Sequence, residues 1–151
     1  MLQHPRVRPL FLLLAIGWAA VIYYLSDQPG IDLPPLFPHV DKLLHLIAYG
    51  VLGFLAMGAC SPAACRQHSG YYWLIVALAG LYGVLDEYHQ SFVPGRDTDP
   101  YDALADVCGG LLGAGLMFLL LRRSAANTAP ATARGTATNP GRRRRTPGNT
   151  D

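Results

Sequence analysis

The chain has 151 residues, about the length of one domain, of which 51% are hydrophobic and only 15% are charged. An ordinary soluble domain carries roughly 25% charged residues, so this composition argues against a soluble protein and favours one of the lipid bilayer. The formal net charge of +2 is too small to indicate a nucleic-acid partner, and seven of the twelve lysine and arginine residues lie at or after Arg122.

Four apolar runs have the length and composition of membrane spans, which need about 20 helical residues. They cover residues 9–25, about 43–60, 71–85 and about 102–121. The runs are continuously apolar and do not alternate, which excludes the strands of a membrane β-barrel. We therefore predict an all-α membrane protein in which residues 9–121 form an antiparallel bundle of four transmembrane helices.

The first run has a second interpretation, since Arg6 and Arg8 precede it as they would precede the core of a signal peptide. A cleavage site needs small residues after the apolar core, and Tyr23, Tyr24 and Leu25 stand there. An uncleaved first span is therefore the better prediction.

Lysine and arginine fall unequally on the two sides of this predicted membrane. The side that holds residues 1–8, the middle loop and residues 122–151 carries ten of them, and the other side carries only Lys42 and Arg96. The positive-inside rule then predicts a protein of the cytoplasmic (inner) membrane with both termini in the cytoplasm. Residues 122–151 are polar and lack apolar periodicity, which predicts a disordered basic tail that either touches anionic lipid or is merely solvated.

The acidic residues gather on the opposite side from most of the arginines. All except Asp151 lie there or within about one helical turn of it: Asp27, Asp32, Asp41, Asp86, Glu87, Asp97, Asp99, Asp102 and Asp106. Antiparallel spans would bring the start of the second span, the end of the third and the start of the fourth to one face. We therefore expect these groups to converge.

Two polar stripes run from this face into the bundle. Asp41, His45 and Tyr49 are spaced four residues apart, and a second stripe is formed by Asp102, Asp106, Gly109 and Gly113. A carboxylate at membrane depth costs roughly 2.5–3.5 kcal/mol, so both stripes must face other helices or a wet cavity. The glycines indicate a close helix–helix approach.

Structural roles compete with functional ones at several of these positions. Asp99, Pro100 and Asp102 have the pattern of a helix start, and Asp41 has a similar explanation. His45 has the pattern of a hydrogen-bonded core histidine as well as that of a proton carrier. Asp86 and Glu87 either form a solvated helix end or a site, because two carboxylates there oppose the helix dipole.

A cation or a proton is needed beside Asp106, which would otherwise repel Asp102 one turn away. Lys42, Arg96 and protonated His45 are available, and a turn at Pro94-Gly95 could fold Arg96 over the mouth of the bundle.

The cysteines Cys60, Cys65 and Cys108 form an odd set without the spacing of a disulfide framework, so we expect free thiols. Cys60 and Cys65 also lack companion ligands, and the sequence predicts no metal and no cofactor.

The polar positions resemble those of the VanZ-like family of small multi-pass bacterial membrane proteins. The matching stretches are Asp41-Lys42-x-x-His45-x-x-x-Tyr49, then Asp86-Glu87-x-His89-Gln90-x-Phe92-x-Pro94-Gly95-Arg96, and finally Asp102-x-x-x-Asp106-x-x-Gly109-x-x-x-Gly113. The resemblance implies a ligand-binding set of Asp41, Lys42, His45, Tyr49, Asp86, Glu87, Gln90, Arg96, Asp102 and Asp106. Many family members have Asn where this chain has Asp106.

The family takes its name from a protein associated with low-level teicoplanin resistance, so the resemblance implies a role at the cell envelope without supplying a reaction. We expect a polar pocket on the outer face that recognises an envelope lipid, a lipid-linked precursor or a lipoglycopeptide. One alternative is an enzyme acting on a lipid-linked substrate, in which Asp86 or Glu87 works with His45 as an acid–base pair while Arg96 and Lys42 hold an anion. Another is an accessory subunit that acts as a homo-oligomer or within an envelope complex.

Overall fold

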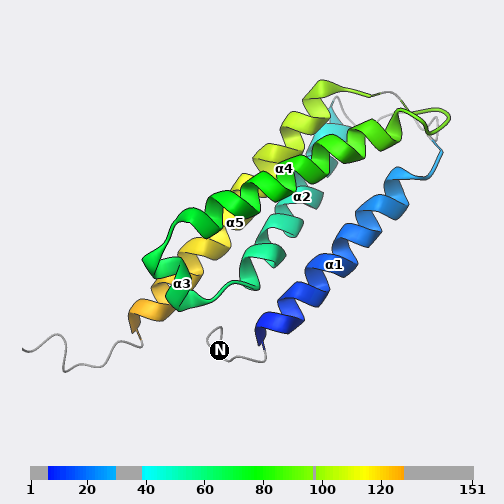
Figure 1. Cartoon of the computed structure of the whole chain (residues 1–151). Coiled ribbons are helices and arrows are strands. Elements are labelled where there is room, and N and C mark those ends of the chain that lie inside the picture. Colours follow the sequence, from blue (N-terminus) through cyan, green and yellow to red (C-terminus); the bar gives the residue numbers. More distant parts are fainter. Residues whose placement is uncertain (1–6, 30–38, 97, 128–151) are drawn as a thin grey trace, which may run out of the picture.

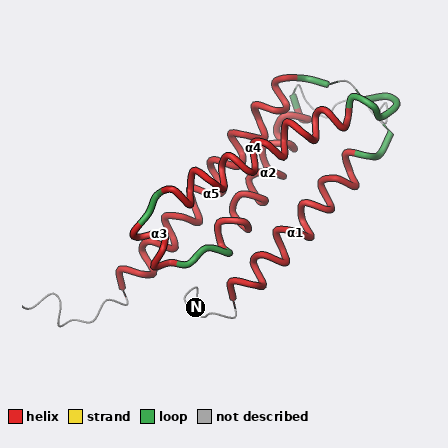
Figure 2. The backbone as a smooth tube through the Cα atoms, viewed as in Figure 1, coloured by secondary structure: helices red, strands yellow, loops and turns green. Residues whose placement is uncertain are grey.

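The computed structural model describes residues 7–29, 39–96 and 98–127, which contain five α-helices and no strand (Figures 1 and 2). In chain order these are α1 (Val7–Ser26), α2 (Val40–Gly58), α3 (Pro62–Gln67), α4 (Gly70–Gln90) and α5 (Pro100–Asn127). The all-α prediction is confirmed. Residues 1–6, 30–38, 97 and 128–151, which include Arg6, Asp32, Asp97 and most of the predicted tail, lie outside the described residues.

Within the described residues, three helices are long and apolar enough to cross a membrane: α1, α2 and the part of α5 from Pro100 to Ser124. The predicted third span corresponds to α4, which has 21 residues but does not belong to this set. Its tyrosines, its tryptophan and its terminal carboxylates reduce its mean hydropathy.

One predicted boundary differs from the structure because hydropathy and helix propensity change at different residues, and one short helix was not predicted. The apolar run of α5 ends near Leu121, but the helix continues to Asn127, so residues 122–127 do not belong to a disordered tail. Arginine and alanine are good helix formers, and they extend the helix past its apolar part. The short helix α3 lies in a loop where no helix was predicted.

α2 and α5 form the most extensive helix–helix contact in the described chain. Their backbones approach at glycines: Gly109 contacts the Leu46 carbonyl, and Gly113 contacts the backbone of Gly50. At Gly53, an added Cβ would lie 2.5 Å from the carbonyl oxygen of Gly110. The glycine spacing indicated this close approach, and no larger residue fits it.

α1 lies beside α2 and α4 and is attached to both by hydrogen bonds to backbone carbonyls (Figure 1). The Trp18 indole donates to the Ala48 carbonyl at 2.8 Å, and the Tyr82 hydroxyl donates to the Ala19 carbonyl at 2.8 Å. Near the other end of α1, Arg8 Nε donates to the carbonyl of Ala59, just after α2, at 3.2 Å.

Large apolar side chains face outward along every long helix. Exposed fractions are 67% for Leu13 on α1, 60% for Leu44 on α2, 60% for Trp73 on α4 and 60% for Leu112 on α5. Exposed apolar surfaces of this kind are suited to contact with lipid tails. The chain is an integral membrane protein. The polar interior is confined to one end of the helices.

Candidate functional site

The buried polar residues lie where α1 and α4 end and where α2 and α5 begin. The set consists of Ser26, Asp86, Glu87, Gln90, Asp102 and Asp106, each at most 8% exposed. The structure thus places the predicted acidic groups of three helices at one end, and it adds a residue from α1. Three clusters of contacts and one arginine organise this end.

The first cluster surrounds Lys42, on the first turn of α2. Its ammonium nitrogen lies 2.9 Å from a carboxylate oxygen of Asp41, 2.6 Å from Asp99 and 3.1 Å from Asp102. Asp99 also caps α5 by accepting the backbone N–H of Tyr101 at 2.9 Å, as its position before Pro100 indicated. The hydrogen bond from Lys42 holds the pKa of the Asp99 carboxyl below its usual range.

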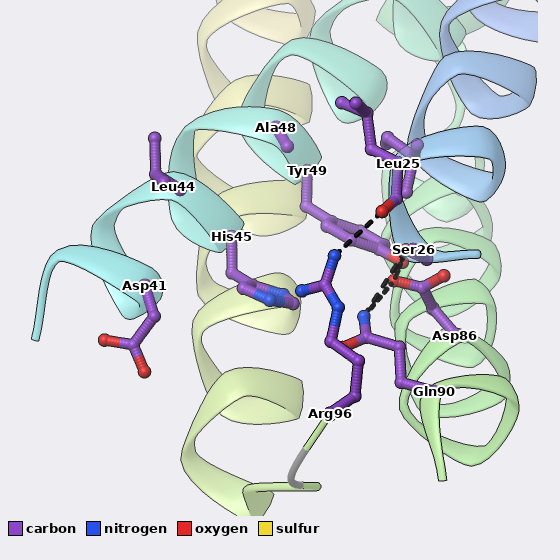
Figure 3. Close-up of a pocket in the computed structure, with 11 residues that line it drawn as sticks. Leu25, Ser26, Asp41, Leu44, His45, Ala48, Tyr49, Asp86, Gln90 and Arg96 are labelled. Atoms are coloured by element: carbon purple, nitrogen blue, oxygen red, sulfur yellow. Dashed lines mark hydrogen bonds between the residues drawn. The ribbon is translucent and has the colours of Figure 1, made fainter. Parts of the chain in front are cut away.

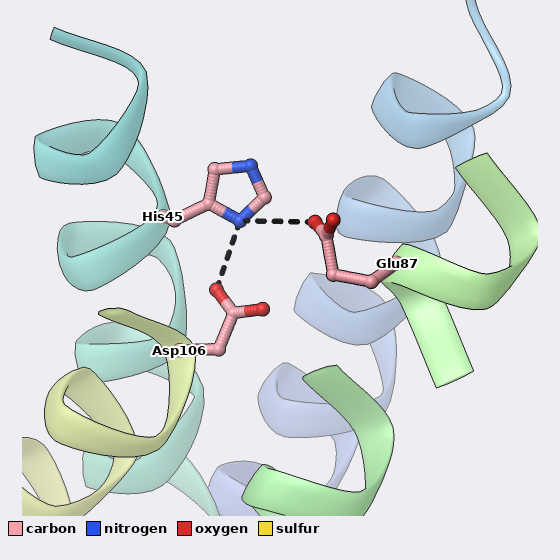
Figure 4. Close-up of side chains that lie close together, drawn as sticks. All are labelled: His45, Glu87 and Asp106. Carbon is pink, nitrogen blue, oxygen red and sulfur yellow. Dashed lines mark hydrogen bonds and ion pairs between the residues drawn. The ribbon is translucent and has the colours of Figure 1, made fainter. Parts of the chain in front are cut away.

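The second cluster joins three helices through His45 (Figure 4). His45 Nδ1 lies 2.9 Å from Asp106 Oδ1 and 4.0 Å from Glu87 Oε1. The other oxygen of Glu87 accepts the backbone N–H of Asp99 at 3.3 Å, which links this cluster to the start of α5. Glu87 Oε1 and Asp106 Oδ2 are buried without a hydrogen-bond partner among the described residues.

The third cluster joins α1 to α4. Asp86 Oδ2 accepts hydrogen bonds from the Ser26 hydroxyl at 2.9 Å and from Gln90 Nε2 at 3.2 Å. The carboxylate therefore has two donors although it lies at a helix end whose dipole opposes it. Ser26 was not predicted as a site residue; its position at the end of the first span, on the acidic side, is the signal that could have identified it.

Arg96 follows a tight turn that brings its side chain back over the end of α1. Gly95 adopts φ 76°, a conformation that favours glycine, and the Arg96 N–H donates to the Val93 carbonyl at 3.2 Å. The guanidinium then donates to the Leu25 carbonyl at 2.8 Å and to the Gln28 carbonyl at 3.2 Å. The sequence indicated this turn, but Arg96 binds backbone carbonyls and pairs with no carboxylate in the described part of the chain.

A cavity of about 240 Å³ lies between α1, α2 and α4 at this end (Figure 3). Its wall combines apolar with polar side chains: Ile22, Leu25, Ser26, Asp41, Leu44, His45, Ala48, Tyr49, Asp86, Gln90 and Arg96. Tyr49 is 1% exposed, and its hydroxyl is buried without a partner among the described residues. The cavity is therefore amphiphilic.

The predicted ligand-binding residues divide into two sets. Asp41, His45, Tyr49, Asp86, Gln90 and Arg96 line the cavity. The other four lie behind this wall, where they hold one another and His45 in place: Lys42, Glu87, Asp102 and Asp106. His89 is partly exposed and pairs with Asp27 at 3.1 Å.

The three cysteines are free thiols, as predicted. Cys65 is buried against Met57 and Met117 at the opposite end of the helices, and burial raises the pKa of its thiol to about 11. Cys65 therefore has a packing role.

Apolar helices around a polar end define a multi-pass membrane protein with an amphiphilic site. Residues 11–121 match the model of the VanZ/LLP1 family, so the chain belongs to this family. Comparisons with curated proteins and with solved structures gave no match. The matched range includes every residue of the three clusters and Arg96.

Proposed function

We propose that this protein binds an amphiphilic component of the cell envelope in the cavity between α1, α2 and α4. The ligand class comprises envelope lipids, lipid-linked precursors and lipoglycopeptides. The observation that carries the proposal is the cavity wall, where Ile22, Leu25 and Leu44 offer apolar surface beside the polar groups of Asp86, Gln90 and Arg96. An acyl chain fits the first set and a polar head group fits the second.

Arg96 is the residue suited to an anionic head group. Its guanidinium carries five N–H donors, and the backbone carbonyls of Leu25 and Gln28 account for two of them. Within residues 7–29, 39–96 and 98–127 no carboxylate neutralises it. A phosphate or carboxylate of the ligand can therefore take the remaining donors in a bidentate arrangement.

The proposal places this cavity on the outer face of the cytoplasmic membrane. Arg8, Arg66, Arg122 and Arg123 lie towards the opposite end of the helices, which the positive-inside rule assigns to the cytoplasm. Both described ends of the chain lie at that end in Figure 1, so both termini are proposed to be cytoplasmic.

We also propose that α4 is a fourth span and completes an antiparallel four-helix bundle. Its 21 residues give a length of about 31 Å, which matches a hydrocarbon core of about 30 Å. Its outward residues Trp73, Leu74, Leu78 and Leu81 are each at least 53% exposed, as lipid-facing residues would be.

An acid–base enzyme is the second candidate function, and the unpartnered oxygens beside His45 favour it. Glu87 Oε1 and His45 Nδ1 are 4.0 Å apart, a separation that a small movement would convert into proton-transfer distance. Lys42 does not fit the anion-holding role predicted for it, because three carboxylates already surround its ammonium group. An accessory subunit, homo-oligomeric or within an envelope complex, is the third candidate; the outward apolar residues of α4 would serve it equally well.

Mass spectrometry of lipids that co-purify with the full chain in mild detergent tests the binding proposal. Wild type should enrich one class of anionic envelope lipid, and Arg96→Gln should lose most of it. Arg8→Gln is the matched control, since Arg8 also donates to a backbone carbonyl but lies at the opposite end. Equal enrichment by wild type and Arg96→Gln, or no enrichment by wild type, would contradict the proposal.

A further inference from the structure

We propose that His45, Glu87 and Asp106 form a binding site for one divalent transition-metal ion, for which Zn²⁺ is the best-fitting probe. This inference goes beyond the binding of an envelope amphiphile, because the ion would be held by the polar interior behind the cavity wall. The three residues come from α2, α4 and α5, and Figure 4 shows their polar groups directed at one another.

The spacing of the donor atoms suits a small cation. One ligand atom from each residue lies within 4.8 Å of the other two. At zinc–ligand distances of about 2.0–2.2 Å, neighbouring donors of a tetrahedral site are about 3.3–3.6 Å apart. The observed separations from His45 Nδ1, 2.9 Å to Asp106 and 4.0 Å to Glu87, lie on either side of that range. Since no two of the three donor atoms are more than 4.8 Å apart, adjustment of the side chains alone would complete the geometry.

Unpartnered oxygens supply an independent observation. Asp106 is fully buried at 0% exposure and Glu87 is 8% exposed, yet Asp106 Oδ2 and Glu87 Oε1 have no hydrogen-bond partner among the described residues. Buried carboxylate oxygens are normally satisfied by donors or by metal coordination. Glu87 Oε1, the oxygen without a hydrogen-bond partner, is the one directed at His45. The unsatisfied acceptor therefore lies within the cluster.

A divalent ion would balance the charge of the ionised cluster. With both carboxyl groups ionised, Glu87 and Asp106 carry two negative charges, and a protonated His45 would compensate only one of them. Lys42 is surrounded by its own three carboxylates, and Arg96 is directed at backbone carbonyls. A divalent cation bound to a neutral imidazole would balance both charges.

The donor types indicate the class of metal. Imidazole nitrogen suits zinc and its transition-metal neighbours, whereas two carboxylates also suit manganese. Three protein ligands leave one coordination position open, and His45 lines the cavity from which water or a ligand oxygen could fill it. No metal site was predicted from the sequence, because the three proposed ligands come from separate helices and share no local spacing motif.

A second acidic cluster serves as an internal control. Asp41, Asp99 and Asp102 also lie close enough to hold a cation, but the Lys42 ammonium group occupies the space among their oxygens. This cluster is therefore satisfied without a metal.

Metal titration of the purified full chain tests the site. Any purification tag is removed, bound metal is stripped with a chelator, and Zn²⁺ is titrated by calorimetry without added lipid. Wild type should bind one Zn²⁺ per chain. His45→Gln and Glu87→Gln should weaken binding by about 100-fold or more, since even supporting residues contribute about 10- to 100-fold. Asp106→Asn keeps an amide oxygen, the group that the family resemblance gives to many members, and should bind more weakly than wild type.

His89→Gln and Asp27→Asn are the matched controls, because they remove a histidine and a carboxylate at the same end, outside both the cluster and the cavity wall. Both should bind Zn²⁺ as wild type does. Wild-type protein loaded with Co²⁺ should show visible absorption bands of a low-coordinate site with nitrogen and oxygen ligands, and this readout does not depend on whether a variant folds.

Absence of Zn²⁺, Mn²⁺ and Co²⁺ binding by wild type would overturn the proposal, as would unchanged binding by correctly folded His45→Gln and Glu87→Gln. Either result would leave lipid co-purification through Arg96 unaffected. The failure of the metal site is thus distinguishable from the failure of the proposed function.

Discussion

Gly83 on α4 makes room for the carboxyl group of Asp106 on α5. A Cβ at Gly83 would lie 2.7 Å from Asp106 Cβ and 2.8 Å from Asp106 Oδ2, closer than real Cβ atoms approach other atoms. Asp106 can therefore be fully buried and reach His45 only because its neighbour on α4 has no side chain.

Gly83→Ala should destabilise the protein, because the added methyl group must displace Asp106 from His45. Overpacking of this kind costs about 1–3 kcal/mol. The measurement is the thermal unfolding midpoint in detergent. Gly17→Ala is the control, since a Cβ at Gly17 meets nothing within 4 Å. Equal midpoints for the two variants would show that Asp106 is not confined in this way.

Lys42→Met should also lower the free energy of unfolding. It removes the cation that contacts Asp102, a carboxylate only 7% exposed, and leaves that charge without its partner. Loss of the partner of a buried polar group costs about 1–3 kcal/mol. Asp41→Asn should cost less than about 1 kcal/mol, because the Asp41 side chain is 56% exposed. A smaller loss for Lys42→Met than for Asp41→Asn would contradict the assignment of Lys42 as the organising cation.

Asp99→Asn should show a pH-dependent effect on stability. Lys42 holds the folded-state pKa of Asp99 below its ordinary value, so the ionised carboxylate stabilises the fold above the unfolded-state pKa of about 3.9. That stabilisation is lost as the pH falls through the lower, folded-state pKa. Asparagine keeps the helix cap, which isolates the charge.

Unfolding midpoints of wild type and Asp99→Asn, recorded from pH 3 to pH 7, check this sign. The difference should be constant from about pH 5 upward and should shrink below about pH 4. A difference that widens as the solution becomes more acidic would be incompatible with a lowered pKa.

Reporter fusions should reveal the proposed orientation. A fusion after Asn127 should report the cytoplasm, and an insertion within residues 28–38 should report the outer side, because ten of the twelve lysines and arginines lie on the first side. An insertion at Gln67, between α3 and α4, should also report the cytoplasm if α4 spans the membrane. An external signal there together with a cytoplasmic signal after Asn127 would remove α4 from the set of spans.

Amide substitutions separate the enzyme from the binding protein. Glu87→Gln and Asp86→Asn keep the shape of the side chain but cannot exchange a proton. If the protein binds a ligand without catalysis, either variant should retain a hydrogen-bond acceptor and should lose at most about 1–3 kcal/mol of binding free energy. The readout is complementation of the envelope phenotype of a deletion strain at matched protein abundance. Complete loss with unchanged lipid binding would favour the acid–base mechanism.

Much of the fold follows from patterns that the chain itself carries. The lengths of the apolar runs locate the helices. Residues four positions apart, such as Asp41 and His45, must share a helix face. Because turns alternate the ends of successive helices, Glu87 and Asp102 were expected together before any contact was known.

The pairings within the site did not follow from the sequence. Whether His45 meets Asp102 or Asp106 depends on the rotation and rise of α2 against α5, and these are set by glycine contacts whose depth no spacing reveals. The partners of Arg96 are backbone carbonyls, which every residue possesses and no sequence motif marks. Ser26 and Asp86 lie on different helices, and only the packing of α1 against α4 brings them together.

The glycine contacts between α2 and α5 divide the site into a fixed and an adjustable part. With Gly109 against Leu46 and Gly113 against Gly50, these two helices cannot slide or separate without losing backbone contact. The backbones that carry Lys42, His45, Asp102 and Asp106 are therefore held at fixed separations. The width of the cavity is set instead by α1, whose wall residues Ile22 and Leu25 face it. A movement of α1 would therefore change the width of the cavity without disturbing the contact between α2 and α5.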